Sequence, residues 1–160
     1  MEKYHKIMKH EIFLDYISRI EKIEEDRIYC RHNIVHLLDV ARIAYLHVLE
    51  QRLPLEKDLV YAAALLHDIG KVDQYEKKIP HELGGAKIAV GILQDCGYAE
   101  GEILQIREAI LHHRRGNCES DNLLAEILYK ADKESRLCMF CKAKDSCKWT
   151  QEEKNDILLF

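Results

Sequence analysis

The sequence lacks any apolar run that approaches the roughly 20 residues of a membrane-spanning helix. Its N-terminal residues, 1–6, lead into an amphipathic pattern and not into the uninterrupted apolar core of a signal peptide. The formal net charge is −4, which argues against a general surface for nucleic acid or anionic membranes. We therefore expect a cytoplasmic protein that binds neither nucleic acid nor a membrane.

Signals for β-strands and for phosphate-binding loops are nearly absent as well. No alternating apolar run is bounded by hairpin turns, no glycine-rich phosphate loop occurs, and no segment repeats. Apolar residues make up 48% and charged residues 32% of the 160 residues, as in an ordinary globular protein. This length suits one domain with a real hydrophobic core. The sequence therefore predicts a single all-α domain.

Apolar residues recur at helical spacing through most of the chain. The expected helices cover residues 7–23, 32–51, 56–68, 81–96 (beginning at His81 or Glu82), 101–113 and 120–135. Residues 71–80 carry charge and a proline without clear periodicity, so a loop is expected there. Ser120 is the expected N-cap of the last long helix. Thr150 and Glu153 match a capping box, which predicts a short terminal helix.

The six cysteines are unevenly distributed along the chain. Cys138, Cys141 and Cys147 form a C-x2-C-x5-C cluster, and without a secretory signal such a cluster favours metal binding or redox chemistry over disulfides. A structural zinc site normally takes four ligands, so Cys118 or a histidine would have to complete a second metal site here. A three-cysteine iron–sulfur cluster and free thiols are the other interpretations.

The most informative stretch is His67-Asp68-Ile69-Gly70, which ends the apolar run over residues 59–66. A buried carboxylate beside an imidazole is costly unless something pairs with both, and a divalent metal is the usual partner. His32 and His36 are four residues apart, so both are expected on one face of a helix. Because helix ends can converge in the core of a bundle, these side chains are expected to share a cavity.

The ordered set of histidines and aspartates resembles the HD-domain superfamily of metal-dependent phosphohydrolases. This set consists of His36, His67-Asp68, His81, His113 and Asp132. Residues 36–42 resemble the family's first-histidine helix, residues 67–71 its signature, and residues 81–86 the extra histidine of its two-metal members. The resemblance implies an HD-domain helical core over residues 1–136, followed by a Cys-containing loop and short terminal helix over residues 137–160.

The same resemblance implies two metals. The first would be held by His36, His67, Asp68 and Asp132. The second would be held by His81 and His113, with the Asp68 carboxylate bridging the pair. Two cations about 3.5–4 Å apart can trap a bridging hydroxide and neutralise a phosphoryl oxygen. Imidazole and carboxylate ligands suit iron, manganese, zinc, cobalt or nickel, and the likeness favours iron or manganese.

His32 and His112 leave the number of metals open. The HD-GYP branch, which degrades cyclic dinucleotides, can place a glutamate one turn before its first histidine and a His-His pair later. This chain has His32 and His112-His113 at the corresponding places. It lacks the Gly-Tyr-Pro part of that signature, since residues 114–117 read Arg-Arg-Gly-Asn. His32 is either a further ligand, a substrate contact or a residue of the helix surface.

The leading interpretation is a phosphohydrolase that acts on a nucleotide or another small phosphate ester or anhydride through a metal-bridging hydroxide. Asp68 and Lys71 are the expected catalytic residues, and Lys71, Arg114 and Arg115 the expected phosphate-binding residues. The HD relative that cleaves diadenosine tetraphosphate is similar in size. The alternatives are a diiron oxygenase of HD fold and a non-catalytic metal- or nucleotide-binding sensor. A homodimer stays open, because an apolar pattern does not distinguish a dimer interface from the core.

Overall fold

The computed structural model describes residues 2–114, 122–158 and 160, and within them it contains helices, turns and loops but no β-strand. The helices are α1 (Tyr4–Ile7), α2 (Glu11–Ile23), α3 (Ile34–Gln51), α4 (Lys57–Leu66), α5 (Lys71–Lys77), α6 (His81–Asp95), α7 (Glu100–His112) and α8 (Leu123–Glu134). Two 3-10 turns follow, η1 (Cys138–Phe140) and η2 (Lys144–Ser146). The all-α prediction is confirmed. Among the residues described, no helix has the length and apolar character of a membrane span.

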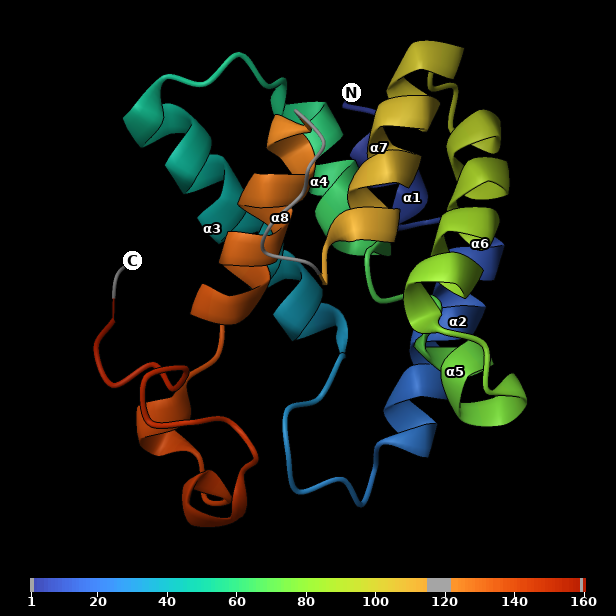
Figure 1. Ribbon diagram of the computed structural model, residues 1–160. Helices are drawn as coiled ribbons and strands as arrows, with labels where there is room; N and C mark the ends of the chain where they lie inside the picture. The colour runs from blue at the N-terminus through green and yellow to red at the C-terminus, as the bar shows by residue number, and fades with distance from the viewer. Residues whose placement is uncertain (1, 115–121, 159) are drawn as a thin grey trace.

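The central helix of the bundle is α4, whose residues are apolar almost without interruption. It packs against α3, α7 and α8, and Figure 1 shows it between them. Its buried residues are Leu59, Val60, Ala62, Ala63, Ala64, Leu65 and Leu66. A helix that is apolar all round must be surrounded by other elements. The His67-Asp68 pair that follows α4 is therefore placed inside the bundle.

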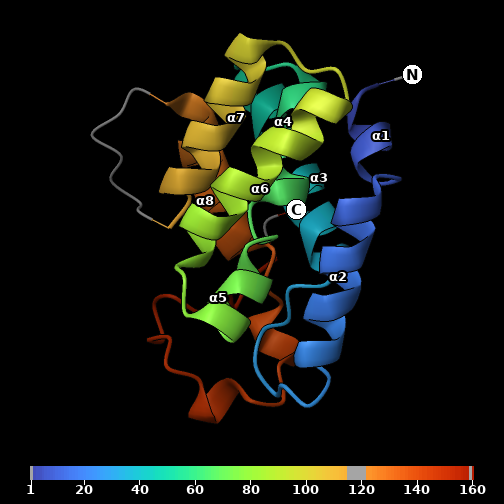
Figure 2. The same cartoon turned by 90° about the vertical axis from the view of Figure 1, so that its right-hand side faces the viewer.

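Two helix pairs enclose α4. On one side α3 packs against α8, and His47 of α3 bonds Glu134 of α8 at 2.5 Å between Nε2 and Oε2. On the other side α6 packs against α7, as Figure 2 shows from the side. The shorter α5 lies between α2 and α6. The ends of α3, α4, α6, α7 and α8 thus surround one region of the core.

The N-terminal segment forms two helices where one was expected over residues 7–23. Asp58, in the first turn of α4, accepts hydrogen bonds from the amides of Lys3 and Tyr4, at 3.1 and 2.8 Å. These amides belong to the start of α1, which the sequence pattern does not mark. His10 then has extended backbone angles and precedes α2. A long-range contact with Asp58 therefore decides where the first helix begins.

The prediction of a loop over residues 71–80 is wrong, because α5 occupies most of it. Val72 and Asp73 are buried on one side of this short helix, and Asp73 pairs with Lys77 one turn later at 2.9 Å. Lys78 adopts left-handed backbone angles, with φ of 60°, and ends the helix. Burial of two adjacent positions in a seven-residue helix gives too little periodicity to be recognised in the sequence.

Two cap predictions also need correction or completion. The predicted terminal helix does not form: the capping-box bonds between Thr150 and Glu153 are present at 2.8 and 3.3 Å, but only turns surround them. A cap supplies about 1 kcal/mol, which does not form a short helix without packing. Ser120, the expected cap of α8, lies outside the described residues. Asn122 caps α8 by accepting from the Ala125 amide at 3.2 Å.

Candidate metal centre

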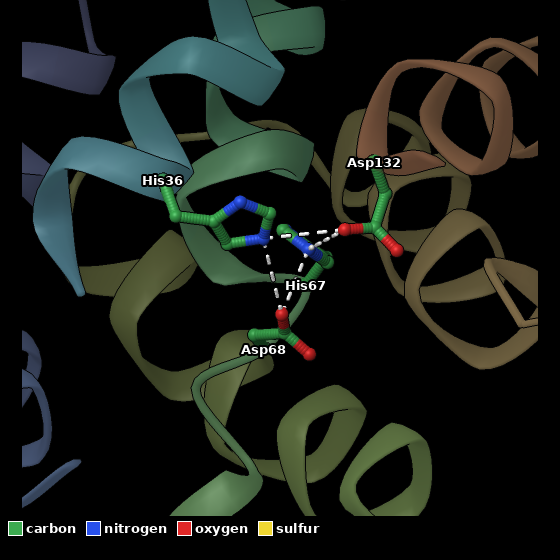
Figure 3. Close-up of side chains that lie close together, drawn as sticks. All are labelled: His36, His67, Asp68 and Asp132. Atoms are coloured by element: carbon green, nitrogen blue, oxygen red, sulfur yellow. Dashed lines mark ion pairs between the residues drawn. The ribbon is translucent and has the colours of Figure 1, made fainter. Parts of the chain in front are cut away.

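The first group of donors brings residues from three helices together. His36 lies in the first turn of α3, where Asn33 accepts a hydrogen bond from the His36 amide at 3.1 Å. His67 and Asp68 follow α4 directly, and Asp132 lies in α8. Each of these four histidines and aspartates offers a donor atom, and the four donor atoms all lie within 4.8 Å of one another (Figure 3).

Distances within this group are those of donors around a common centre. His36 Nε2 lies 3.2 Å from Asp132 Oδ1 and 3.5 Å from Asp68 Oδ2. His67 Nε2 lies 3.0 Å from Asp68 Oδ2 and 3.7 Å from Asp132 Oδ1. Figure 3 shows the two rings and the two carboxylates pointing toward one another. The group therefore offers four converging donors, three of them on buried residues.

A second group shares Asp68 with the first. His81 is the first residue of α6 and His113 is the residue that follows α7. Their Nε2 atoms lie 3.4 and 3.9 Å from Asp68 Oδ1. The histidines of the first group instead face the other oxygen, Oδ2. One carboxylate thus presents one oxygen to each group of histidines.

Hydrogen bonds on the outer side of each ring decide which nitrogen faces the centre. The Nδ1 atoms of His67 and His113 donate to the backbone carbonyl oxygens three residues earlier, at 2.7 and 2.6 Å. His81 Nδ1 donates to Gln74 Oε1 at 2.6 Å. The ring of an imidazole whose Nδ1 carries the proton has its lone pair on Nε2. All three rings therefore direct a lone pair inward, as metal ligands do.

The inward nitrogens of His67, His81 and His113 lack protein donors, and this supports a metal at the centre. His67 Nε2 is buried and has no hydrogen-bond partner in the part of the chain that the structure describes. His81 Nε2 and His113 Nε2 lie only 3.2 Å apart. Two lone pairs in such contact repel each other unless a proton or a cation lies between them. A divalent cation satisfies these nitrogens and the carboxylates together, so the donor set fits a metal.

The pKa values follow from the opposition between burial and charge. Burial would lower the pKa of His67, but the carboxylates of Asp68 and Asp132 outweigh it and raise that pKa to about 10. Burial would raise the pKa of both aspartates, but the neighbouring histidines hold them well below their usual range. Burial lowers the pKa of His113, and it lowers that of His81 to about 3. The two carboxylates thus favour positive charge at His67 Nε2, and a bound cation would supply that charge in place of a proton.

His32 lies beside the first group but belongs to neither. Its Nε2 is 4.0 Å from Asp68 Oδ2. Its Nδ1 and its amide bond the buried carboxylate of Glu24 at 2.5 and 2.7 Å, and the Tyr75 hydroxyl donates to that carboxylate at 2.5 Å. Since α3 begins after His32, the prediction that His32 and His36 share a helical face is wrong. Glu24 directs His32 instead.

Lys71 points toward the centre from the first turn of α5. Its Nζ lies 3.9 Å from Asp68 Oδ1, and its side chain is 13% exposed. Burial lowers the pKa of Lys71, with the Asp68 carboxylate opposing that effect. Lys71 lines a pocket of about 510 Å³ that opens onto His32, His81, His113 and Asp132. Five more cations line the same pocket: Arg27, Arg114, Lys133, Arg136 and Lys148.

The remaining residues predicted for the site do not belong to either donor group. Arg114 lines the pocket, but its guanidinium pairs with Glu82 at 3.3 Å. Arg115 lies outside the described residues. His112 Nε2 pairs with Glu108 at 3.5 Å, and His112 is in neither donor group. The three clustered cysteines line an adjoining pocket of about 370 Å³, and Cys147 also lines the first pocket.

Several residues at the centre were missed or underweighted by sequence reasoning. Glu24, Gln74 and Tyr75 carry no motif, and the structure alone connects them to His32 and His81. Trp149 lines the substrate-sized pocket although it lies in the C-terminal extension. What marks Glu24 is its burial, since only 2% of this charged residue is exposed. Burial of this kind depends on tertiary contacts, so the sequence gives no signal for it.

Comparison with known proteins identifies the family of the chain. A family model described as the HD domain matches residues 33–137. A protein of Clostridium beijerinckii, described as uncharacterized, is 44% identical over 155 residues and covers 97% of both chains. Ribonuclease Y of Listeria monocytogenes is 28% identical over 123 residues, which are 77% of this chain and 22% of that protein. The likeness to Ribonuclease Y therefore spans about a fifth of that enzyme.

A solved structure shares the fold. It is the crystal structure of a predicted HD superfamily hydrolase from an uncultured Thermotogales bacterium. The TM-score is 0.65 at 23% sequence identity, and the match covers 89% of this chain and 79% of the other. The helical arrangement around the donor groups is thus one that a solved protein also adopts.

Proposed function

This chain belongs to the HD-domain family, and from that premise we propose that it is a dinuclear metal-dependent phosphohydrolase. The observation that supports this proposal most strongly is that the two carboxylate oxygens of Asp68 face different pairs of histidines. Its Oδ2 faces His36 and His67, while its Oδ1 faces His81 and His113. A carboxylate shared in this way suits two adjacent cations better than one. Iron or manganese fits the mixed nitrogen and oxygen donors.

Two bound divalent cations would supply Lewis-acid polarisation of a phosphoryl oxygen and a water of lowered pKa. The protein supplies position and charge. Lys71, buried beside Asp68, is placed to hold a phosphate oxygen. Arg136 Nη2 lies 3.1 Å from His36 Nε2 and its side chain lines the pocket, so it is placed to contact a phosphate as well. Glu24 holds His32 at the edge of the centre, where it can contact the substrate.

The lining of the pocket supports a small nucleotide as substrate. Lysines and arginines line the pocket above the donor groups, and they complement several phosphate charges. The aromatic rings of Tyr29 and Trp149 line it as well and offer a surface for a base. A volume of about 510 Å³ matches a small-molecule site. Charge and aromatic surface together favour a nucleoside phosphate over a plain sugar phosphate.

A phosphodiester is the second candidate substrate. The observation that favours it is the likeness to Ribonuclease Y, which spans the part of the chain that carries the donor groups. A phosphodiester and a phosphoanhydride need the same neutralisation of a phosphoryl oxygen. A short RNA therefore belongs in the substrate panel beside nucleotides.

The decisive experiment joins metal analysis with a hydrolysis screen. Purified protein is loaded with Mn²⁺ or Fe²⁺ without oxygen, the bound metal is counted, and phosphate release is measured on nucleotides, dinucleoside polyphosphates and short RNA. We expect about two metals per chain and hydrolysis of at least one nucleotide. Asp68→Asn should lose metal and at least a thousandfold in rate, because one group serves both donor sets.

The matched control is Asp73→Asn. Asp73 is a buried aspartate five residues later, and its carboxylate pairs with Lys77, outside both donor groups. Asp73→Asn should keep its metal and its rate. Retained hydrolysis in Asp68→Asn would refute the proposed site, and oxygen consumption without phosphate release would refute the proposed reaction.

A further inference from the structure

Four thiols from two distant parts of the chain meet at the lower end of the bundle. Cys138, Cys141 and Cys147 belong to the C-terminal extension, while Cys30 belongs to the loop after α2. All four line the pocket of about 370 Å³. Figures 1 and 2 both show this loop beside the extension. The sequence analysis looked for a fourth ligand in Cys118 or a histidine and overlooked Cys30.

Hydrogen bonds hold the loop and the extension together around these thiols. The Tyr29 hydroxyl donates to the backbone carbonyl of Ser146 at 3.3 Å. Arg136, just before the extension, donates to the backbone carbonyl of Arg31 at 2.7 Å. Arg27 donates to the carbonyl of Cys30 itself at 2.8 Å. Hydrogen bonds therefore fix the residues on both sides of Cys30, and they hold Cys30 at the pocket.

The local backbone of the cluster has the form used by zinc ligands. Cys138 begins the turn η1, and the Cys141 amide donates to the Cys138 carbonyl at 3.1 Å. The spacing C-x2-C across a tight turn is typical of structural zinc sites. Burial raises the pKa of Cys30, Arg136 opposes that effect, and the three clustered cysteines are close enough to raise it further.

Charge around the pocket favours a thiolate centre. Four thiolates around one dication carry a net charge of −2. The cations Arg31, Arg136, Lys144 and Lys154 line the pocket, and Asp39 is the sole carboxylate among its lining residues in the described part of the chain. These cations would offset the negative charge of a site with four thiolates.

The extension has almost no hydrophobic core of its own. Among its described residues, 137–158 and 160, only Cys138 and Ala143 are buried. Leu137 and Phe140 are 55% and 77% exposed. A segment with so small a core usually needs a metal or a disulfide to be ordered. A cross-link to Cys30 would also fasten the loop that carries His32.

We propose that Cys30, Cys138, Cys141 and Cys147 bind one Zn²⁺ ion in a structural site separate from the His/Asp centre. In the described part of the chain, no three thiols have their sulfurs within 4.8 Å of one another, so binding must draw them inward. The site clamps the extension to the loop after α2. It thereby fixes Lys148 and Trp149 of the extension and His32 of the loop, all of which line the substrate pocket.

The test uses Co²⁺ as a spectroscopic substitute for zinc in the full-length, reduced protein. The thiolate-to-cobalt charge-transfer band reports sulfur ligands only, so metal at the His/Asp centre does not obscure it. We expect one cobalt ion with this thiolate signal per chain, and Zn²⁺ should displace it. Cys30→Ser and Cys147→Ser should each lose this signal, while Cys30→His should keep a tetrahedral signal, because imidazole also binds zinc.

Cys96→Ser and Cys118→Ser are the controls, and both should keep the full thiolate signal. Cys96 is buried at the end of α6 and lines neither pocket. Loss of zinc should also speed proteolytic cleavage within residues 137–158 at least tenfold, with circular dichroism unchanged. A missing thiolate signal, a disulfide in the purified protein, the spectrum of an iron–sulfur cluster, or loss of the signal in Cys118→Ser in place of Cys30→Ser would each overturn the proposal.

Discussion

Asp68 and Glu24 are the two buried carboxylates around which the centre is organised, and they differ in what they hold. Asp68 faces imidazole nitrogens of both donor groups, and a positive charge between them, from a proton or a cation, would stabilise the cluster. Glu24 instead accepts hydrogen bonds from the His32 amide, the His32 ring and the Tyr75 hydroxyl. Glu24 is satisfied by the protein alone, and its role is to position His32.

Glu24→Gln gives a prediction at this scale. Burial would raise the pKa of Glu24, but its bonds to His32 and Tyr75 lower it from 4.5 to about 2. A carboxyl whose folded pKa is depressed stabilises the protein above its unfolded pKa and loses that contribution as the pH falls. At pH 7 the substitution should reduce the free energy of unfolding by about 2 kcal/mol. Between pH 4.5 and pH 2 the difference from wild type should shrink.

Denaturant unfolding at several pH values measures this effect. Glu25→Gln, which changes the exposed neighbouring carboxylate, should leave the free energy of unfolding nearly unchanged. A difference between Glu24→Gln and wild type that stayed constant down to pH 2 would contradict the account of Glu24.

Among the elements, the turn between α4 and α5 approaches the backbone of α6 very closely. A Cβ on Gly70 would lie 2.0 Å from the His81 carbonyl oxygen and 2.4 Å from the Gly85 amide. Both atoms belong to the backbone of α6, so they cannot move aside cheaply. Gly70 has an ordinary negative φ, and its role is therefore close approach and not an unusual backbone angle. This approach brings His81 toward Asp68.

Gly70→Ala should therefore lower the free energy of unfolding by about 3 kcal/mol, because α6 must shift to make room. The same shift would move His81, so the variant should also bind less metal. Gly91→Ala, in the α6 helix that Gly70 approaches, is the control, since nothing lies within 4 Å of the Gly91 Cβ position. That control should gain about 0.5–1 kcal/mol. Thermal unfolding and metal content measure both effects, and a harmless Gly70→Ala would refute the close packing.

At the scale of the elements, the sequence predicts long helices well and short ones poorly. The helix α4 is recognisable because its apolar run is continuous, and α6 begins at His81 as expected. The helix α5 was missed and the terminal helix after Thr150 does not form, because packing decides the fate of short segments. His32 was placed on a helix that begins two residues later, at Ile34.

For the whole molecule, metal should add stability by mass action. The donor residues come from α3, α4, α6, α7 and α8 or the residues next to them, so an ion bound there joins most of the bundle. A ligand that binds only the folded state at a hundredfold its Kd adds about 2.7 kcal/mol. For a domain of this size, Mn²⁺ should raise the Tm by about 5–10 °C.

A thermal shift series with Mn²⁺ and a chelator measures this gain. Asp68→Asn should show no shift with Mn²⁺. His47→Gln, which changes a buried histidine bonded to Glu134 outside the donor groups, should show the same shift as wild type. An equal shift in Asp68→Asn would mean that the metal binds elsewhere.

The sequence by itself determined the all-α class and the order of the donor residues, because both depend on local periodicity and on side-chain chemistry. His36, His67, Asp68, His81, His113 and Asp132 are recognisable in the chain before any fold is known. Tertiary structure alone decided that Asp68 turns one oxygen to each group of histidines. It also decided that Glu24 holds His32 and that Cys30 joins the C-terminal thiols. These pairings join residues far apart in the chain, and their burial depends on how the helices pack.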